Sequence, residues 1–338
     1  MLGGVEPLYL AVSVLVSLVV TVVLVRAWIP VAHARGFVGF DKNKPGERRV
    51  AEMGGVWAIN GAVFGLLVLV ALYRYLHGTV FYGYELFGLS LLLFMAGFIG
   101  LIDDILGWKK GLRRRYRILA TIPIALPLVV IQAGVSRMNI PLLGTIDLGL
   151  LYPLVLVPIG VMGAANAFNM IAGYNGLEAG MGLLLMLFTA YYSLAEGLVH
   201  VFYASMTMAG ALAGFLVYNW YPARVFPGNT LTYAVGAYYA GLVIIGNFEK
   251  FGLTLFALYF IEFALYLRGR LHGVDKENFA SLAEGRMRPP YERAYSLTHI
   301  ALMVLDRTVG ATEVRVVLFI LSLQALVGLV SLALFLPS

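Results

Sequence analysis

The sequence predicts an all-α, polytopic membrane protein with about ten transmembrane helices, both termini outside and the polar loops cytoplasmic. Apolar residues make up 61% of the 338 residues and charged residues 12%, against about 45–50% and about 25% in soluble domains. Apolar runs recur that can cross about 30 Å of hydrocarbon, which takes roughly 20 residues. A chain with so few charges cannot cover its own surface, so the bilayer must be its solvent.

The apolar runs predict a single integral membrane domain over 1–338. No basic segment and no small-residue cleavage site precedes the first run, so it is expected to be a retained span rather than a signal peptide. A stretch near 290–308 allows a further amphipathic helix on the surface. The predicted spans lie near 7–29, 54–76, 86–105, 117–135, 148–167, 177–195, 198–219, 231–247, 251–268 and 314–336.

The basic residues predict the orientation. With the N-terminus outside, 21 of the 24 Lys and Arg residues fall in inner loops, and only Arg74, Arg137 and Lys250 fall outside. Cytoplasmic loops carry such an excess, which also accounts for the net charge of +6 without nucleic acid as a partner. The chain has no cysteine, which excludes a disulfide framework and a thiolate metal site.

An asparagine motif follows the fifth predicted span. Asn166 and Asn169 are three residues apart, so they share a helix face. Gly173 and Gly176, on either side of Asn175, are predicted to end the helix and let the backbone approach a ligand. A capped helix end with a glycine-rich turn explains the motif equally well.

A carboxylate pair, Asp103-Asp104, ends the third predicted span and precedes six basic residues between 109 and 117. Adjacent carboxylates are costly at a membrane boundary and usually have a function there. They can hold a hard cation or act as a base, while the basic run gathers phosphate. Orientation charges alone explain the basic run but not the pair.

Three further inner loops are polar: 39–55 with its lysines and double glycine, 218–230 with Pro-Gly-Asn-Thr, and the basic loop 268–298. The sequence thus predicts that carboxylates, amides, glycine turns and cations meet at one membrane face. That combination suits phosphoryl transfer, in which positioning and charge neutralisation do most of the work.

In this order, the motifs GFDKNK, AEMGG, IDDILGW, NAFNMIAGYNGLEAG and YNWYPARVFPGNT resemble the polyprenyl-phosphate N-acetylhexosamine-1-phosphate transferase superfamily. The stretches AGYNGLEAG and NWYPARVF are most similar to its UDP-GlcNAc:dolichyl-phosphate GlcNAc-1-phosphotransferase branch, in an archaeal-type member. The resemblance covers about 36–300.

The resemblance implies transfer of GlcNAc-1-phosphate from UDP-GlcNAc to dolichyl or another polyprenyl phosphate. The products would be lipid-diphosphate-GlcNAc and UMP, with Mg²⁺ or Mn²⁺ as cofactor. The reaction would take place at the cytoplasmic face of the cell membrane, as the first step of lipid-linked oligosaccharide assembly for N-glycosylation.

The resemblance also implies roles for single residues. Asp103 and Asp104 match the catalytic pair, and either could be the base. The metal ligands would be Asn169 and Asn229. The remaining matches are Lys44, Glu52, Gly173, Asn175 and Gly176 around the nucleotide, and Arg117, Arg268, Arg270 and His272 around phosphate and sugar.

One departure from the superfamily pattern is Gly228-Asn229, where the pattern is Gly-Asp. An amide oxygen can bind Mg²⁺ but brings no charge. The chain could therefore be an active enzyme, an enzyme of lower metal affinity, or a weak or inactive homologue that binds UDP-sugar and lipid phosphate.

A transporter without chemistry is the alternative from another class. Transporters usually carry mid-membrane charges and often inverted repeats. Glu262 is the main candidate for such a charge, and no repeat is evident. The sequence leaves open the exact N-acetylhexosamine, the lipid length and whether the chain forms a homodimer.

Overall fold

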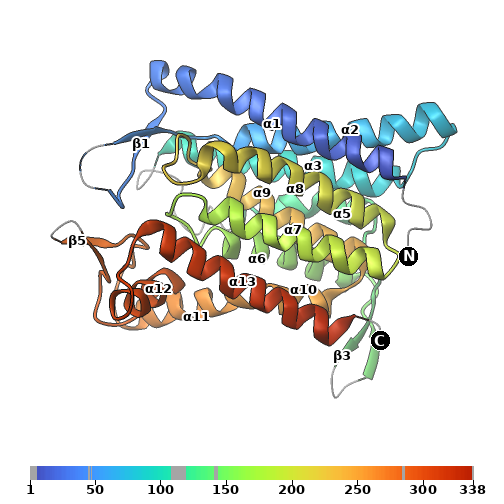
Figure 1. Cartoon of the computed structure of the whole chain (residues 1–338). Coiled ribbons are helices and arrows are strands. Elements are labelled where there is room, and N and C mark those ends of the chain that lie inside the picture. Colours follow the sequence, from blue (N-terminus) through green and yellow to red (C-terminus); the bar gives the residue numbers. More distant parts are fainter. Residues whose placement is uncertain are drawn as a thin grey trace.

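A computed structural model of the chain describes residues 6–44, 46, 48–107, 119–140, 144–283 and 286–336. Within these ranges the protein is a mostly helical, elongated bundle (Figure 1). The long helices are α1 (Pro7–Arg35), α2 (Gly55–His77), α3 (Gly83–Leu106), α7 (Leu177–Ala195), α8 (Val199–Asn219), α9 (Gly228–Gly246) and α13 (Glu313–Phe335). The shorter ones are η1 (Ile122–Ala125), α5 (Leu126–Val130), η2 (Tyr152–Leu156), α6 (Val157–Phe168), α10 (Glu249–Leu255), α11 (Ala257–Leu271) and α12 (Leu297–Asp306).

Three antiparallel strand pairs lie at the ends of the bundle (Figure 1). They are β1 (Val38–Phe40) with β2 (Arg49–Ala51), β3 (Arg137–Ile140) with β4 (Gly144–Asp147), and β5 (Ser281–Ala283) with β6 (Arg286–Arg288). The β1, β5 and α12 labels lie at one end of the bundle (Figure 1). The start of α1, the end of α13 and β3 lie at the opposite end.

The protein is a multi-pass membrane protein. Among the described residues, six helices are long and apolar enough to cross a membrane: α1, α2, α3, α7, α8 and α13. The pair α10–α11 is a seventh candidate, bent by 56° at its break. The prediction of about ten spans is therefore confirmed only in part. The predicted span at 117–135 is represented by η1 and α5, and residues 117 and 118 lie outside the described ranges.

One difference from the prediction has a physical cause. The helix predicted at 231–247 is α9, which is not among the six, and 17 of its 19 residues are buried by other helices. A helix surrounded by protein need not be as apolar as one that faces lipid. The segment near 290–308, where an amphipathic helix was expected, contains the short helix α12, which has Ser296 as its N-cap and buries Leu297 and Leu302.

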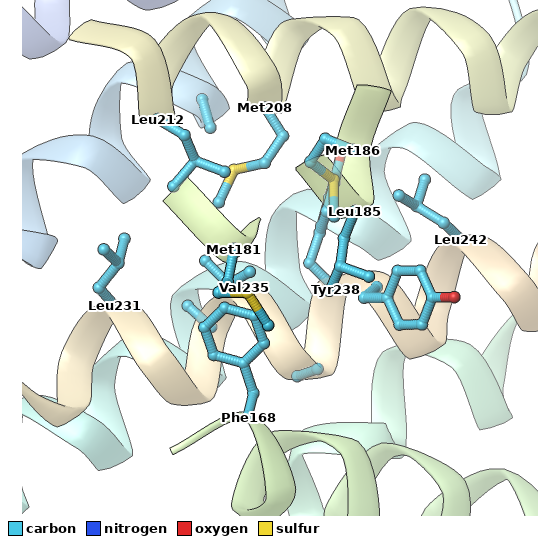
Figure 2. Packing of buried hydrophobic residues seen from close by; sticks show 14 of the residues in the cluster. Phe168, Met181, Leu185, Met186, Met208, Leu212, Leu231, Val235, Tyr238 and Leu242 are labelled. Carbon is cyan, nitrogen blue, oxygen red and sulfur yellow. The ribbon is translucent and has the colours of Figure 1, made fainter. Parts of the chain in front are cut away.

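The core surrounds α9. Figure 2 shows α9 side chains, among them Leu231 and Val235, packed against Phe168 of α6, Met181 of α7 and Leu212 of α8. These side chains are almost completely buried. The packing fixes α9 within the bundle, and with it the polar residues of its first turn.

The loops at the β1 end are held together by backbone hydrogen bonds. The amide of Phe226 donates to the carbonyl of Ala51 over 2.7 Å, and the amides of Gly54 and Gly55 donate to Phe226 and Pro227 over 3.0 Å. The side-chain amide of Asn278 donates to the carbonyls of Met170 and Ala172 over 3.0 Å. The loops predicted to meet at one face therefore do lie at one end of the bundle.

Candidate active site

Asp104 ties the end of α3 to the start of α9. Its Oδ1 accepts from the amide of Asn229 over 2.7 Å, and its Oδ2 accepts from the amide and the hydroxyl of Thr230 over 3.0 and 2.7 Å. A carboxylate at a helix N-terminus satisfies amides that have no partner within the helix. Gly228 permits this approach, because a Cβ there would lie 2.4 Å from Asp104 Oδ2.

Asp103 lies beside Asn229 and is only 4% exposed. Its Oδ2 accepts from Asn229 Nδ2 over 3.1 Å and from the Tyr233 hydroxyl over 3.4 Å. Because the nitrogen and oxygen of one amide point in different directions, this bond turns the Asn229 oxygen away from Asp103. Asn229 lines the large cavity described below, and neither aspartate does.

Thr232 links the two asparagines that were predicted as metal ligands. Its hydroxyl contacts Asn169 Oδ1 over 2.8 Å and the Asn229 carbonyl over 3.2 Å. Asn166, one turn before Asn169, donates to the Thr121 hydroxyl over 2.9 Å. Asn166, Asn169 and Asn229 line the same cavity, as the i, i+3 spacing of the first two predicted.

The side-chain oxygens at the cavity could hold a metal ion only together with oxygens of a bound substrate. Asn169 and Asn229 offer neutral oxygens at the cavity, while the charged oxygens of Asp103 and Asp104 accept hydrogen bonds behind Asn229. In the described part of the chain, no group of three His, Asp or Glu side chains is placed to hold a metal ion. Mg²⁺ binds proteins through one or two carboxylates plus substrate phosphates, so phosphate oxygens would have to complete this site.

The cavity that the asparagines line has a volume of about 1120 Å³. It runs between α6, α9, α10 and α11, and most of its wall is apolar. Gly160 and Gly163 of α6 line it, and a Cβ at either position would meet nothing within 4 Å. Exposed apolar residues form part of its rim, among them Ile159, Leu253 and Phe263. The cavity is thus a polar pocket continued by an apolar groove.

Lys276 is a cation at this cavity that the sequence analysis missed. It forms an ion pair with Glu262, which is 0% exposed. Glu262 also accepts from the Leu297 amide over 2.7 Å and the Ser296 hydroxyl over 3.1 Å. Glu262 itself was the available signal, since a carboxylate within an apolar span requires a partner. The mid-membrane charge considered for a transporter therefore belongs to this ion pair.

The three basic residues predicted for phosphate and sugar do not line the cavity. Arg268 lies near the ring of Tyr295, and its carbonyl contacts His272 Nδ1 over 2.8 Å. Arg270 lies 4.0 Å from Asp275, with both side chains largely exposed. Arg117, the fourth, lies outside the described residues.

Two residues predicted for the nucleotide, Lys44 and Asn175, lie in one buried cluster. Asn175 donates to Asp41 over 3.1 Å through its side chain and to Glu313 over 2.8 Å through its backbone amide. Lys44 forms ion pairs with Asp41 and Glu313, and it lies over the ring of Tyr221. Asp41 and Glu313 were not predicted, because no local pattern relates the first inner loop to the start of α13.

Gly173 and Gly176 have the left-handed conformation that a glycine-rich turn requires, with φ of 107° and 83°. Their missing side chains make room for Phe279 and Trp220, which a Cβ would approach to 3.0 and 2.6 Å. The Gly173 amide donates to the buried Glu178 over 2.9 Å. The turn around Asn175 is thus built by long-range packing as well as by glycine.

Glu52 is the last of the five residues predicted for the nucleotide. Burial raises the pKa of the Glu52 carboxyl, and the Asp104 carboxylate raises it further. Its backbone carbonyl accepts from the Trp28 indole over 2.7 Å. Glu52 therefore lies within electrostatic range of Asp104.

Residues 86–247 match the model of a family described as glycosyl transferase family 4. A Sulfolobus acidocaldarius protein is 35% identical over 298 residues, which cover 86% of this chain and 87% of the relative. The chain belongs to this family. The glycosyl transferase family 4 match contains the aspartate pair, the asparagine motif and Asn229, so the resemblance stated from the motifs is confirmed.

The names of the relatives agree with the predicted branch. The Sulfolobus protein is provisionally named a UDP-N-acetylglucosamine–dolichyl-phosphate N-acetylglucosaminephosphotransferase. A Schizosaccharomyces pombe protein that carries this name is 30% identical over 276 residues, 68% of this chain and 60% of the relative. A Carboxydothermus hydrogenoformans phospho-N-acetylmuramoyl-pentapeptide-transferase is 30% identical over 242 residues, 67% of this chain and 73% of the relative.

Proposed function

We propose that this protein transfers GlcNAc-1-phosphate from UDP-GlcNAc to dolichyl phosphate or another polyprenyl phosphate. An oxygen of the lipid phosphate attacks the β-phosphorus, the bond to UMP breaks, and lipid-diphosphate-GlcNAc and UMP leave. The observation that carries the proposal is the cavity, where a polar end with three asparagines and Lys276 continues into an apolar groove. The names of the relatives support the choice of both substrates.

The groove suits the tail of a lipid substrate. Gly160 and Gly163 form its open floor, and exposed Ile159, Leu253 and Phe263 on its rim would face acyl chains. A lipid phosphate could therefore slide in sideways from the bilayer and place its headgroup beside Asn169. The hydrophobic effect contributes little to this step, because the bilayer is as apolar as the groove.

The polar end suits the two phosphates. Mg²⁺, held by the Asn169 and Asn229 oxygens and by substrate phosphate, would neutralise charge on the diphosphate. Asp104 holds Asn229 and Thr230 in place, and Asp103 orients the Asn229 amide. Lys276, held by Glu262, places a positive charge at the same cavity. The aspartate pair thus positions Asn229 and the first turn of α9 at the cavity.

We further propose ten crossings, with both termini outside and the site at the cytoplasmic face. The excess of basic residues in the loops near β1, β5 and α12 supports this orientation. The buried helix α9, the pair η2–α6, the bent pair α10–α11 and the segment containing α5 would supply the four crossings beyond the six.

Release of UMP from UDP-GlcNAc by the purified protein in detergent tests the function. We expect release only when both Mg²⁺ and a polyprenyl phosphate are present. Release without lipid would indicate a hydrolase instead. Intact nucleotide binding without any release would identify an inactive homologue, and uptake of substrate into liposomes without UMP would favour the transporter.

Replacing Gly163 with leucine is expected to block the lipid and spare the fold. A Cβ at this position meets nothing within 4 Å, so the new side chain starts in open space in the groove and should compete with a tail. We expect the KM for polyprenyl phosphate to rise by about tenfold or more, equivalent to about 1.4 kcal/mol, with unchanged UDP-GlcNAc binding.

Ala264→Leu is the matched control for this substitution. Ala264 is exposed on α11 and does not line the cavity, so this variant places the same leucine side chain outside the groove. Equal effects of the two variants, or a normal KM for Gly163→Leu, would exclude the groove as the lipid site.

A further inference from the structure

A polar pair lies at the end of the groove that is remote from the asparagines. The hydroxyl of Tyr152 donates to Glu249 Oε1 over 3.0 Å, and both residues line the cavity. Tyr152 precedes Asn166 by 14 positions along η2 and α6, which corresponds to about 20 Å at the rise of an α-helix. The groove therefore runs from a site of phosphate chemistry to a single tyrosine–glutamate hydrogen bond.

This pair is held by three segments of the chain. Tyr152 begins η2 and is 4% exposed, and Glu249 begins α10. Gly134 lies against the tyrosine, since a Cβ there would be 2.4 Å from the hydroxyl oxygen. Met138 of β3 lines the cavity at this end as well. The ring of Tyr152 therefore cannot swing aside without disturbing neighbouring backbone.

The Tyr152–Glu249 pair limits how far a lipid tail can extend along the groove. Since burial in the groove gains little over the bilayer, the shape of the groove and its end decide which tails fit. An alkyl chain that separated the pair would leave the hydroxyl of the buried Tyr152 without a partner, which is costly in apolar surroundings. A long tail is therefore stopped at the pair and must turn out past the exposed rim.

We propose that the Tyr152–Glu249 pair is the end stop of the acceptor groove and determines specificity for the length of the lipid tail. A tail shorter than the groove never reaches the pair, whereas a longer tail is braced against it. This bracing holds the phosphate of a long acceptor beside Asn169. The proposal rests on the proposed function, because it requires a lipid phosphate in the groove.

The test compares geranyl phosphate, a short acceptor, with undecaprenyl phosphate, a long one, in the intact detergent-purified protein. Tyr152→Phe keeps the ring and removes the hydrogen bond. We expect kcat/KM for the long acceptor to fall by about fivefold, the effect of one net hydrogen bond, with little change for the short one. Glu249→Gln can still accept from the tyrosine, so it should keep the selectivity of the unmodified protein.

Two outcomes would overturn the proposal: equal losses with both acceptors, which indicate a purely structural role, or no loss with either. Failure of the proposed function would be recognised separately, because the unmodified protein would then use neither acceptor. Thermal unfolding of each variant accompanies the kinetics, and the short acceptor serves as a test of folding within the same preparation.

Discussion

Asn229→Asp is expected to make the stability of the protein depend on Mg²⁺. In the unmodified protein, Asn229 Nδ2 donates to Asp103 over 3.1 Å, and a carboxylate at this position has no proton to donate. It would instead repel Asp103 and add a third charge beside Asp104. Two like charges about 4 Å apart repel by about 4 kcal/mol at an effective dielectric constant of about 20. Mg²⁺ would relieve this repulsion by binding between the carboxylates.

Thermal unfolding in detergent, with Mg²⁺ or with a chelator, measures this effect. We expect the Tm of Asn229→Asp to fall by several degrees in chelator and to recover in Mg²⁺, since about 1 kcal/mol shifts the Tm of a large domain by about 2–4 °C. The Tm of the unmodified protein should hardly respond. Calorimetric titration with Mg²⁺ without nucleotide should detect tight binding by the variant alone.

Asn166→Asp is the matched control, because Asn166 lines the same cavity but bonds to Thr121 and Met162 rather than to an aspartate. If both variants responded equally to Mg²⁺, the effect would be general surface charge. Tight Mg²⁺ binding by the unmodified protein would contradict a site that depends on substrate phosphate. A rise in turnover by orders of magnitude in Asn229→Asp would identify the natural chain as a weak variant.

Asp104→Asn is expected to lower UMP formation by about 10²–10³-fold, the range seen when a preorganised polar group of an active site is removed. The carboxylate accepts from two backbone amides and one hydroxyl at the start of α9. An asparagine would turn its NH₂ group towards one of these donors. A buried donor without a partner costs about 1–3 kcal/mol, so the position of Asn229 should loosen as well.

Thr230→Val tests whether the loss of activity in Asp104→Asn comes from a single lost hydrogen bond or from the loss of the carboxylate itself. It removes only the hydroxyl bond to Asp104 and keeps both amide bonds, so a small loss of activity is expected. UMP release and thermal unfolding of both variants are compared at a temperature where each is folded. Full turnover by Asp104→Asn would exclude any role of this carboxylate in the reaction.

Local patterns predicted most of the long apolar helices well. The predicted spans at 7–29, 54–76, 177–195, 198–219 and 314–336 correspond to α1, α2, α7, α8 and α13 within a few residues, apart from the longer end of α1. Each of these helices is long and apolar enough to cross the bilayer, so composition and length suffice to locate them. The start of the helix that carries the site was predicted less accurately. Asn229 was assigned to a loop but lies in the first turn of α9.

The candidate site was predictable only where its geometry is local. The shared face of Asn166 and Asn169 follows from helical spacing, and the turn around Asn175 follows from its glycines. Lys276 was missed, and Arg268 with its neighbours was preferred, because basic residues in a loop look alike without the fold. The ion pair with Glu262 sets Lys276 apart from the other basic residues of its loop. This contact joins α11 to the loop that follows it.

The sequence by itself determined that the chain is a membrane protein, where most of its long apolar helices lie, and which family it belongs to. These properties depend on composition and on short motifs. Only the tertiary structure decided that Asn229 faces the cavity with the aspartates behind it. It likewise decided that Lys276 lies at the cavity and that Tyr152 meets Glu249 at the far end of the groove. These contacts join segments far apart along the chain, and helical periodicity specifies a face without naming its partner.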